Sequence, residues 1–180
     1  MEDCSSNWND LIQRMGRWAI PIFAIGMAHL FVPDAEAQKG QSQLRGTVTG
    51  KVVQITDGDT YEVQTTEAGQ LTVRLHGVDA PESDQPYGRE ATEAARQYVG
   101  GKRVRLHVQG NGPYGRVIAK VKIQNAELGE LLVQGGYAWH YERYAPQDDR
   151  LKRFQQKARR NRRGLWGRQD PVPPWEWRHQ

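Results

Sequence analysis

Short segments rich in β-branched residues, separated by tight-turn dipeptides, dominate the centre of the chain. Three such segments lie within residues 46–77, and the dipeptides Asp57-Gly58 and Ala68-Gly69 separate them. An Asp-Gly pair permits the positive φ angles that a tight hairpin demands, and alternation of apolar with polar residues is typical of a half-buried strand. The pattern therefore predicts an antiparallel meander of three strands.

A helical pattern follows the meander. Within Arg89–Val99, alanine and tyrosine side chains recur at spacings of three and four, and Gly100-Gly101 ends the pattern. The later segments continue with two strands, Arg103–Val108 and Val117–Ile123, and two helices, Ala126–Gln134 and about Gln147–Arg163. Five short strands with a helix after the third and two C-terminal helices predict an α+β, mainly β fold: a five-stranded barrel of the OB type with three helices.

The size and composition of the chain suit one domain with extensions. It has 180 residues, of which 37% are hydrophobic and 26% charged, enough apolar material for a single core. We expect residues 38–45 to be a flexible lead and residues 46–167 to form the domain. Residues 168–180 are a Pro/Trp-rich tail without a helical or strand period, for which we expect an extended conformation.

The N-terminus has the layout of a secretory signal peptide. Arg14 and Arg17 precede an apolar run over residues 19–32, and the small-residue site Ala35-Glu36-Ala37 follows. Cleavage after this site predicts that residues 1–37 are removed, giving a secreted or periplasmic protein without a stable membrane span.

Two further features of this segment affect the prediction. A start at Met15 would give a more compact basic region, and an uncleaved N-terminal helix that anchors the protein in the membrane is the alternative to cleavage. The only cysteine, Cys4, lies in the removable segment, so the mature protein would have neither disulfides nor a thiolate zinc site.

The charge of the chain favours a polyanionic partner. The whole chain has 25 basic and 21 acidic residues, a net charge of +4, and residues 1–37 hold two of the basic and five of the acidic ones. The remaining 23 basic and 16 acidic residues give +7, which is compatible with nucleic acid or a membrane surface as a partner.

Three acidic residues fall where the strand pattern breaks. Asp59 follows the first turn signal, and Asp79 and Glu82 follow the third predicted strand. Pairing of the strands would bring them together, and carboxylates without nearby Cys or clustered His favour a hard cation, Ca²⁺ or Mg²⁺. Arg74 and Arg116 would balance their charge and bind phosphate oxygens. A cation, two guanidinium groups and a spare carboxylate are the components needed for phosphodiester hydrolysis.

Three sequence blocks resemble the signature blocks of the staphylococcal nuclease (thermonuclease) family. They are Asp57-Gly58-Asp59-Thr60, Val73-Arg74-Leu75-x-Gly77-Val78-Asp79-Ala80-Pro81-Glu82 and Tyr114-Gly115-Arg116. The resemblance spans roughly Gly46 to Trp166. It implies an OB-fold barrel with three helices and a Ca²⁺-dependent endonuclease that hydrolyses DNA and RNA, preferably single-stranded, to products ending in 3′-phosphate. We expect such a protein to be a monomer.

The resemblance also implies roles for individual residues. The metal ligands would be Asp59, Asp79 and the backbone carbonyl of Ala80. The catalytic residues would be Arg74, Glu82 as general base, and Arg116. The substrate-binding aromatic residues would be Tyr114 and Tyr144.

Some features of the sequence depart from the family or allow another interpretation. Gly112-Pro113 stands where family members often carry an acidic-basic pair, which leaves affinity and base preference open. Asp57 is better explained as a turn former than as a ligand. The basic side chains of the last predicted helix form either a solvated face or a nucleic-acid contact.

Two other functions remain as alternatives. One is a catalytically inactive OB-fold module that binds single-stranded nucleic acid, which would not require Asp59, Asp79 and Glu82 together. The other is a divergent phosphodiesterase that acts on small nucleotides or surface polymers.

Overall fold

The computed structural model of the chain describes residues 44–180. The predicted signal peptide, and with it the choice between cleavage and anchoring, lies outside these residues. None of the helices within the described part of the chain combines the length and the apolarity that a membrane span requires.

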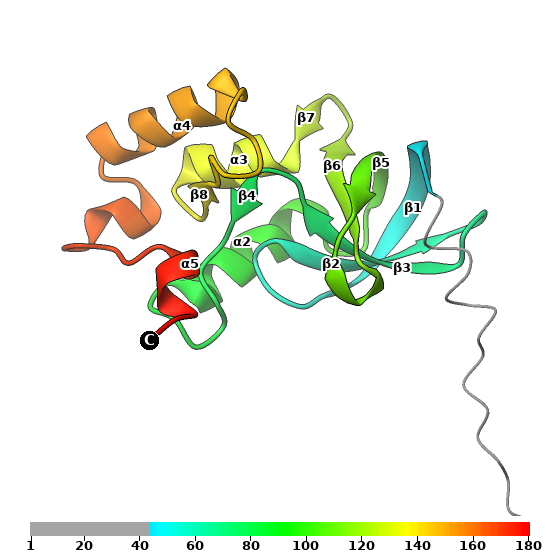
Figure 1. The fold of residues 1–180 in the computed structure, drawn as a ribbon, viewed down its shortest axis with the longest axis horizontal. Coiled ribbons are helices and arrows are strands. Elements are labelled where there is room, and N and C mark those ends of the chain that lie inside the picture. The colour runs from blue at the N-terminus through cyan, green and yellow to red at the C-terminus, as the bar shows by residue number, and fades with distance from the viewer. Residues whose placement is uncertain (1–43) are drawn as a thin grey trace, which may run out of the picture. The chain divides into compact units, whose positions relative to one another are not determined.

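Five strands close into a barrel (Figure 1). They are β1 (Gly46–Ile55), β2 (Thr60–Thr65), β3 (Gln70–Leu75), β5 (Arg103–Asn111) and β6 (Val117–Ile123). Antiparallel pairing joins β3 to β2, β2 to β1, β1 to β5 and β5 to β6. A parallel pairing of β3 with β6 completes the closure. The predicted OB-type barrel and its mainly β character are confirmed.

The barrel strands alternate as the sequence predicts. In β3, Leu71, Val73 and Leu75 point into the core, whereas the residues between them are half-buried. Strand β6 has the bounds that its alternating pattern predicts. Strand β5 runs three residues further than expected, to Asn111, because it pairs with the start of β6 beyond a bulge.

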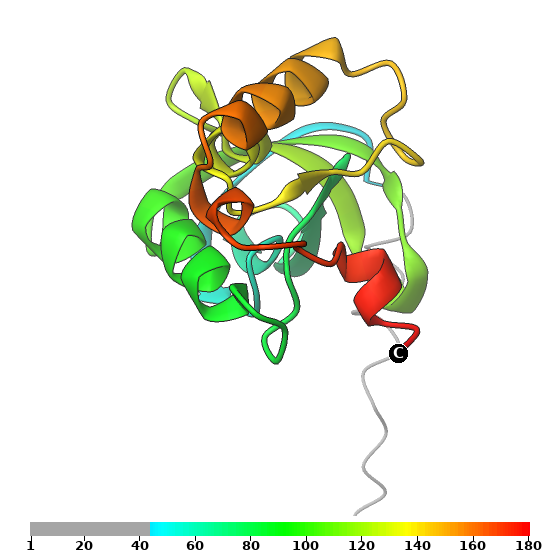
Figure 2. The ribbon, with the colours of Figure 1, turned by 90° about the vertical axis from the view of Figure 1, so that its left-hand side faces the viewer.

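Three helices of eight or more residues gather on one side of the barrel, as Figures 1 and 2 show. They are α2 (Gly88–Val99), α3 (Leu128–Gly135) and α4 (Asp149–Arg160). The prediction that the second helix begins at Ala126 is wrong, because residues 126–127 form the short strand β7 (Ala126–Glu127) beside β6. Helix α4 is shorter at both ends than predicted and begins where the Asp148 side chain accepts a hydrogen bond from the Leu151 amide at 3.1 Å.

Two short strands and three short helices complete the described chain. Strands β4 (Val78–Asp79) and β8 (Trp139–His140) pair antiparallel in a separate two-stranded sheet. The short helices are η3 (Pro113–Gly115), η4 (Gly164–Gly167) and α5 (Pro174–Trp177).

The turn at Asp57-Gly58 differs from the prediction. Neither residue has a positive φ angle, so the tight hairpin expected from this dipeptide is wrong. Glycine is needed here for space, because a Cβ on Gly58 would lie 2.6 Å from the Cβ of Ala80. At the second predicted turn, Gly69 does adopt a positive φ, +66°.

The C-terminal tail packs on the domain. The prediction of an extended tail is wrong for α5, which lies beside the chain leading from β4 into α2 (Figure 1). The Trp175 ring stacks on Tyr141, with centroids 4.9 Å apart and planes 6° from parallel. It also meets the edge of Trp139 at 6.4 Å. These contacts explain why a four-residue helix without a sequence period is ordered here.

Candidate active site

The barrel brings Asp59 and Arg74 together. Asp59 lies in the loop between β1 and β2, and strand pairing places Thr60, its neighbour in sequence, opposite Arg74 on β3. The Leu75 amide donates to the Asp59 carbonyl at 2.9 Å. This backbone contact holds the loop against β3 immediately before the chain turns towards β4.

Arg74 bridges two buried carboxylates. Its guanidinium donates through Nη1 to Asp59 Oδ1 and through Nη2 to Asp79 Oδ1. Both aspartates are fully buried, and the Arg74 side chain is 18% exposed. Buried charges are costly unless they are paired and hydrogen-bonded, so the three side chains form one electrostatic unit.

Asp59 has further hydrogen-bond partners. The amide of Ala80 donates to Asp59 Oδ2 at 2.7 Å, and the Thr60 hydroxyl donates to Asp59 Oδ1 at 3.1 Å. Burial raises the pKa of Asp59 well above its usual range, against the opposing attraction of Arg74. Burial alone would lower the pKa of Arg74, but the charges of Asp59 and Asp79 outweigh it and raise that pKa. The hydrogen bond from its amide places the backbone of Ala80, whose carbonyl is the predicted ligand, next to Asp59.

Glu82 follows Asp79 on the same stretch of chain and is half-buried. A compact turn fixes its backbone, because the Glu82 amide donates to the Gln85 side chain at 3.1 Å and the Gln85 amide donates to the Glu82 carbonyl at 3.0 Å. This turn fixes the backbone of Glu82 three residues after the buried Asp79.

Arg178 is a member of this cluster that the sequence analysis missed. Its Nη2 lies 2.7 Å from Asp79 Oδ2 and its Nη1 lies 3.3 Å from Asp79 Oδ1. The same Nη1 donates to Glu82 Oε1. Burial would lower the pKa of Arg178, but the hydrogen bonds that it donates to Asp79 and Glu82 raise it instead. No sequence pattern marks this arginine, which is 99 positions from Asp79.

A cleft of about 700 Å³ opens over the cluster. Its lining residues come from β3, from the chain after β4, from the turn before β6, from the chain after β8 and from the C-terminus: Arg74, Glu82, Arg116, Tyr141, Tyr144 and Arg178. Both predicted catalytic arginines thus border the same space as the predicted base. Of the two predicted aromatic residues, Tyr144 lines the cleft.

The turn before β6 positions Arg116. Its Nε donates to the Pro113 carbonyl at 3.3 Å, and the Gly112 amide donates to the Arg116 carbonyl at 2.8 Å. Tyr114 has a φ of 59° and is 96% exposed, with the Arg116 guanidinium 5.9 Å from its ring centroid. Tyr114 does not line the cleft, but it lies beside an arginine that does.

The donor set suits a hard cation. Asp59 and Asp79 are close enough for one guanidinium to reach both, and the oxygen-only environment is the kind that Ca²⁺ and Mg²⁺ prefer. Within residues 44–180, no three side chains of Asp, Glu, His or Cys group as ready-made metal ligands. A cation here would therefore need backbone or water oxygens in addition to the two aspartates.

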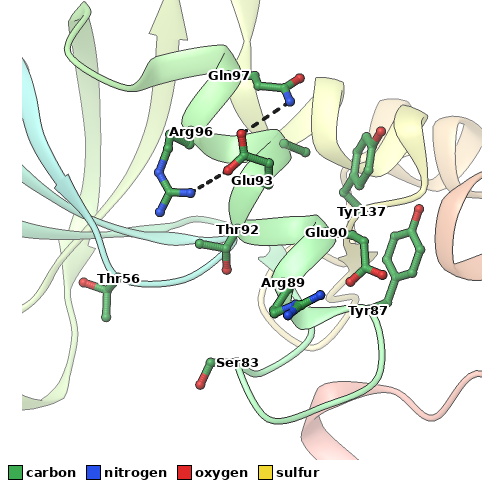
Figure 3. Close-up of a pocket in the computed structure, with 11 residues that line it drawn as sticks. Thr56, Ser83, Tyr87, Arg89, Glu90, Thr92, Glu93, Arg96, Gln97 and Tyr137 are labelled. Carbon is green, nitrogen blue, oxygen red and sulfur yellow. Dashed lines mark hydrogen bonds and ion pairs between the residues drawn. The ribbon is translucent and has the colours of Figure 1, made fainter.

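A second pocket, of about 680 Å³, lies along α2 (Figure 3). Glu93 at its rim pairs with Arg96 at 2.5 Å and accepts from Gln97 at 3.5 Å. The pocket contains none of the predicted site residues.

The chain is similar to several known proteins. The family model described as staphylococcal nuclease homologue matches residues 72–168. An uncharacterized endonuclease of Escherichia coli is 40% identical over 134 residues, covering 74% of this chain and 86% of the relative. An uncharacterized endonuclease of Haemophilus influenzae is 35% identical over 132 residues, 73% of this chain and 74% of the relative. A probable staphylococcal-like nuclease of Oryza sativa subsp. japonica is 39% identical over 111 residues, 62% of this chain and 33% of the relative. The chain therefore belongs to the staphylococcal nuclease homologue family.

Proposed function

We propose that this protein is a calcium-dependent endonuclease that hydrolyses phosphodiester bonds in DNA and RNA. The observation that carries the proposal is the cluster in which Arg74 bridges Asp59 and Asp79 beneath a cleft that Glu82 and Arg116 also border. Its relatives in Escherichia coli and Haemophilus influenzae are named as endonucleases, and this supports the same reaction class.

Asp59, Asp79 and the backbone carbonyl of Ala80 would hold the cation. Two buried carboxylates and a neighbouring backbone supply the oxygen ligands that a hard cation needs. When bound, a divalent cation supplies charge stabilisation for the phosphate in the transition state. The hydrogen bonds from Arg74 hold the two carboxylates in place in its absence.

Arg74 and Arg116 would bind the phosphate group from two sides of the cleft. A guanidinium group has five donors, so Arg74 can contact a phosphate while it continues to contact an aspartate. Arg116 lines the cleft, and its Nε donates to the Pro113 carbonyl. Donors placed where negative charge develops are the usual source of large rate effects.

Glu82 would orient and deprotonate the attacking water. Its carboxylate borders the cleft and lies next to Asp79, to which it is linked through Arg178. A carboxylate at this edge can accept a proton from water held over the phosphate.

The cleft also suggests the form of the substrate. Tyr144 at the cleft and Tyr114 beside Arg116 are both largely exposed, and exposed aromatic rings stack on unpaired bases. This supports a preference for single-stranded DNA or RNA. Products ending in 3′-phosphate are part of the same proposal, by analogy with the family.

We also infer that the protein acts outside the cytoplasm, as a monomer. The arginine, apolar and Ala-x-Ala pattern of residues 1–37 supports secretion or release into the periplasm after cleavage. The barrel closes within one chain and all the proposed site residues come from that chain, which supports a monomer. N-terminal sequencing of the exported protein should read Gln38 as the first residue, whereas an intact N-terminus on a membrane-bound protein would contradict export by cleavage.

A cleavage assay tests the function. The purified protein is incubated with denatured DNA or with RNA, once with calcium and once with a chelator, and the ends of the products are analysed. We expect internal cleavage only with calcium, with phosphate at the 3′ ends. Binding of the nucleic acid without cleavage would instead identify a non-cutting single-strand-binding module.

A further inference from the structure

The C-terminal tail is attached to the domain by contacts at several points. The Val172 carbonyl accepts a hydrogen bond from the Gln85 side chain at 2.7 Å. Pro174 is buried. The Trp175 ring stacks on the Tyr141 ring and lies nearly perpendicular to the Trp139 ring. Figure 2 shows the tail running from the end of η4 to α5. These contacts fix the position of α5 and therefore of the residue that follows it.

Arg178, which follows α5, contacts both carboxylate oxygens of Asp79. Asp79 Oδ2 accepts from Arg178 at 2.7 Å, and Oδ1 is contacted by both Arg178 and Arg74. Both carboxylate oxygens of a fully buried aspartate are therefore engaged by guanidinium groups. Arg178 is at the same time paired with Glu82, so one side chain covers both a proposed cation ligand and the proposed base.

A divalent cation at Asp79 and the observed position of Arg178 exclude one another. They would share the same oxygen atoms, and two positive charges at a few ångströms repel strongly in a partly buried site. The Arg178 side chain is 38% exposed, so it can move into solvent while Arg74, at 18%, is enclosed by the barrel.

We propose that Arg178 is an additional residue of the site that sets its affinity for the divalent cation, with the C-terminal tail acting as a tethered competitor. The inference rests on the proposed cation site. Arg178 leaves Asp79 and Glu82 when the cation binds, which also frees Glu82 to accept a proton. The cation binds only those molecules in which the tail has opened. Its apparent dissociation constant is therefore the dissociation constant of the open form divided by the fraction of molecules that are open.

Two variants separate this competition from a simple change in charge. Arg178→Gln removes the competing guanidinium. Trp175→Ala keeps every charge but removes the stacking on Tyr141 that holds the tail. Arg160→Gln is the matched control, because it removes one positive charge from an exposed position on α4.

Calcium binding is measured by titration calorimetry on the purified protein, without nucleic acid. We expect Arg178→Gln and Trp175→Ala to bind calcium more tightly than the unaltered protein by roughly three- to tenfold, the range produced when a mostly closed tail opens. The control Arg160→Gln should change the affinity by less than about twofold, because salt screens the charge of an exposed side chain.

Coupling between the tail and the cation must act in both directions. Calcium added to the unaltered protein should therefore shift the indole N–H resonance of Trp175 in an NMR spectrum, and Trp175→Ala identifies that resonance. Thermal unfolding of each variant confirms that the barrel remains folded during the titrations.

Asp79→Asn distinguishes failure of this inference from failure of the proposed cation site. If Asp79→Asn weakens calcium binding but Arg178→Gln and Trp175→Ala leave it unchanged, the competition is wrong and the cation site stands. If Asp79→Asn binds calcium as well as the unaltered protein does, the cation site itself is wrong and the competition is overturned with it.

Discussion

Arg74 and Asp59 form an ion pair between neighbouring segments of the barrel, although 15 positions separate them in the sequence. The pair exists because β2 and β3 are adjacent antiparallel strands that place Thr60 opposite Arg74. Since Arg74 also contacts Asp79, it has a structural and a proposed catalytic role at the same position, and the two roles can be measured separately.

Replacing Arg74 should affect both roles. In Arg74→Ala the carboxylates of Asp59 and Asp79 remain buried without their shared partner, and breaking a buried pair in this way costs about 3–5 kcal/mol. Turnover should fall by about two to three orders of magnitude, as for loss of one charge-stabilising donor. Urea unfolding and steady-state kinetics measure the two effects.

Arg74→Lys retains a positive charge and should recover more stability than turnover, because lysine lacks the planar fork. Turnover near that of the unaltered protein in Arg74→Ala would refute the phosphate-binding role.

Glu82→Gln should lower kcat at saturating calcium, where its ion-pair partner Arg178 is already displaced. The substitution keeps the shape of the side chain and removes only the basic carboxylate, so we expect kcat to fall by about 10²- to 10⁴-fold with little change in stability. Kinetics at saturating calcium measure this. Glu90→Gln, on the exposed face of α2, is the control and should retain full turnover. Equal activity of the two variants would exclude Glu82 as the base.

Asp59→Ala should raise the calcium requirement. The variant loses one of two proposed carboxylate ligands, so half-maximal activity should need more calcium, while activity at saturating calcium falls less. A calcium titration of the cleavage rate measures this shift. An unchanged calcium requirement would show that Asp59 serves the fold through Arg74 and binds no cation.

Asp148 should make the fold sensitive to acid. Burial would raise its pKa, but the hydrogen bond from Lys120, at 2.8 Å, and that from the Leu151 amide outweigh burial and lower it. A lowered folded-state pKa contributes stability above the unfolded-state value and loses it as the pH falls through the folded-state value. Asp148→Asn can still cap α4, so at pH 7 it should lose only about 1 kcal/mol. The difference in unfolding free energy between variant and unaltered protein should disappear as the pH falls below the ordinary aspartate value, and a difference that stays constant would contradict the ion pair.

Gly58→Ala should destabilise the loop that carries Asp59. The added Cβ would lie 2.6 Å from the Cβ of Ala80 and 3.1 Å from that of Ala91, and overpacking of this kind costs about 1–3 kcal/mol. Gly110→Ala, where a Cβ would meet nothing within 4 Å, is the control. Equal unfolding free energies for the two variants would show that the backbone at Gly58 can move aside.

The sequence predicts those parts of the fold and site that depend on local pattern. Alternation within Val117–Ile123 predicts a strand, because Val117, Ala119 and Val121 are buried in the core and the residues between them are not. Asp79 and Glu82 can be singled out because they lie within one short motif. Arg178 could not be found in this way, since its position depends on the packing of Trp175 against Tyr141, a contact between distant segments that leaves no periodic signal. The need for glycine at position 58 cannot be predicted for a related reason, because its neighbour Ala80 is distant in sequence and close only after folding.

The parallel pairing of β3 with β6 links closure of the barrel to the spacing of the two arginines. In its register Arg74 lies opposite Ile118, two residues after Arg116. If β3 and β6 slipped by one residue, the Arg74 guanidinium would shift relative to that of Arg116 by about 3.3 Å, the rise per strand residue. A shift of this size exceeds the tolerance of a bidentate phosphate contact. Sequence changes that preserve this strand register would thus preserve the distance between the two arginines, even where the loops around the cleft vary.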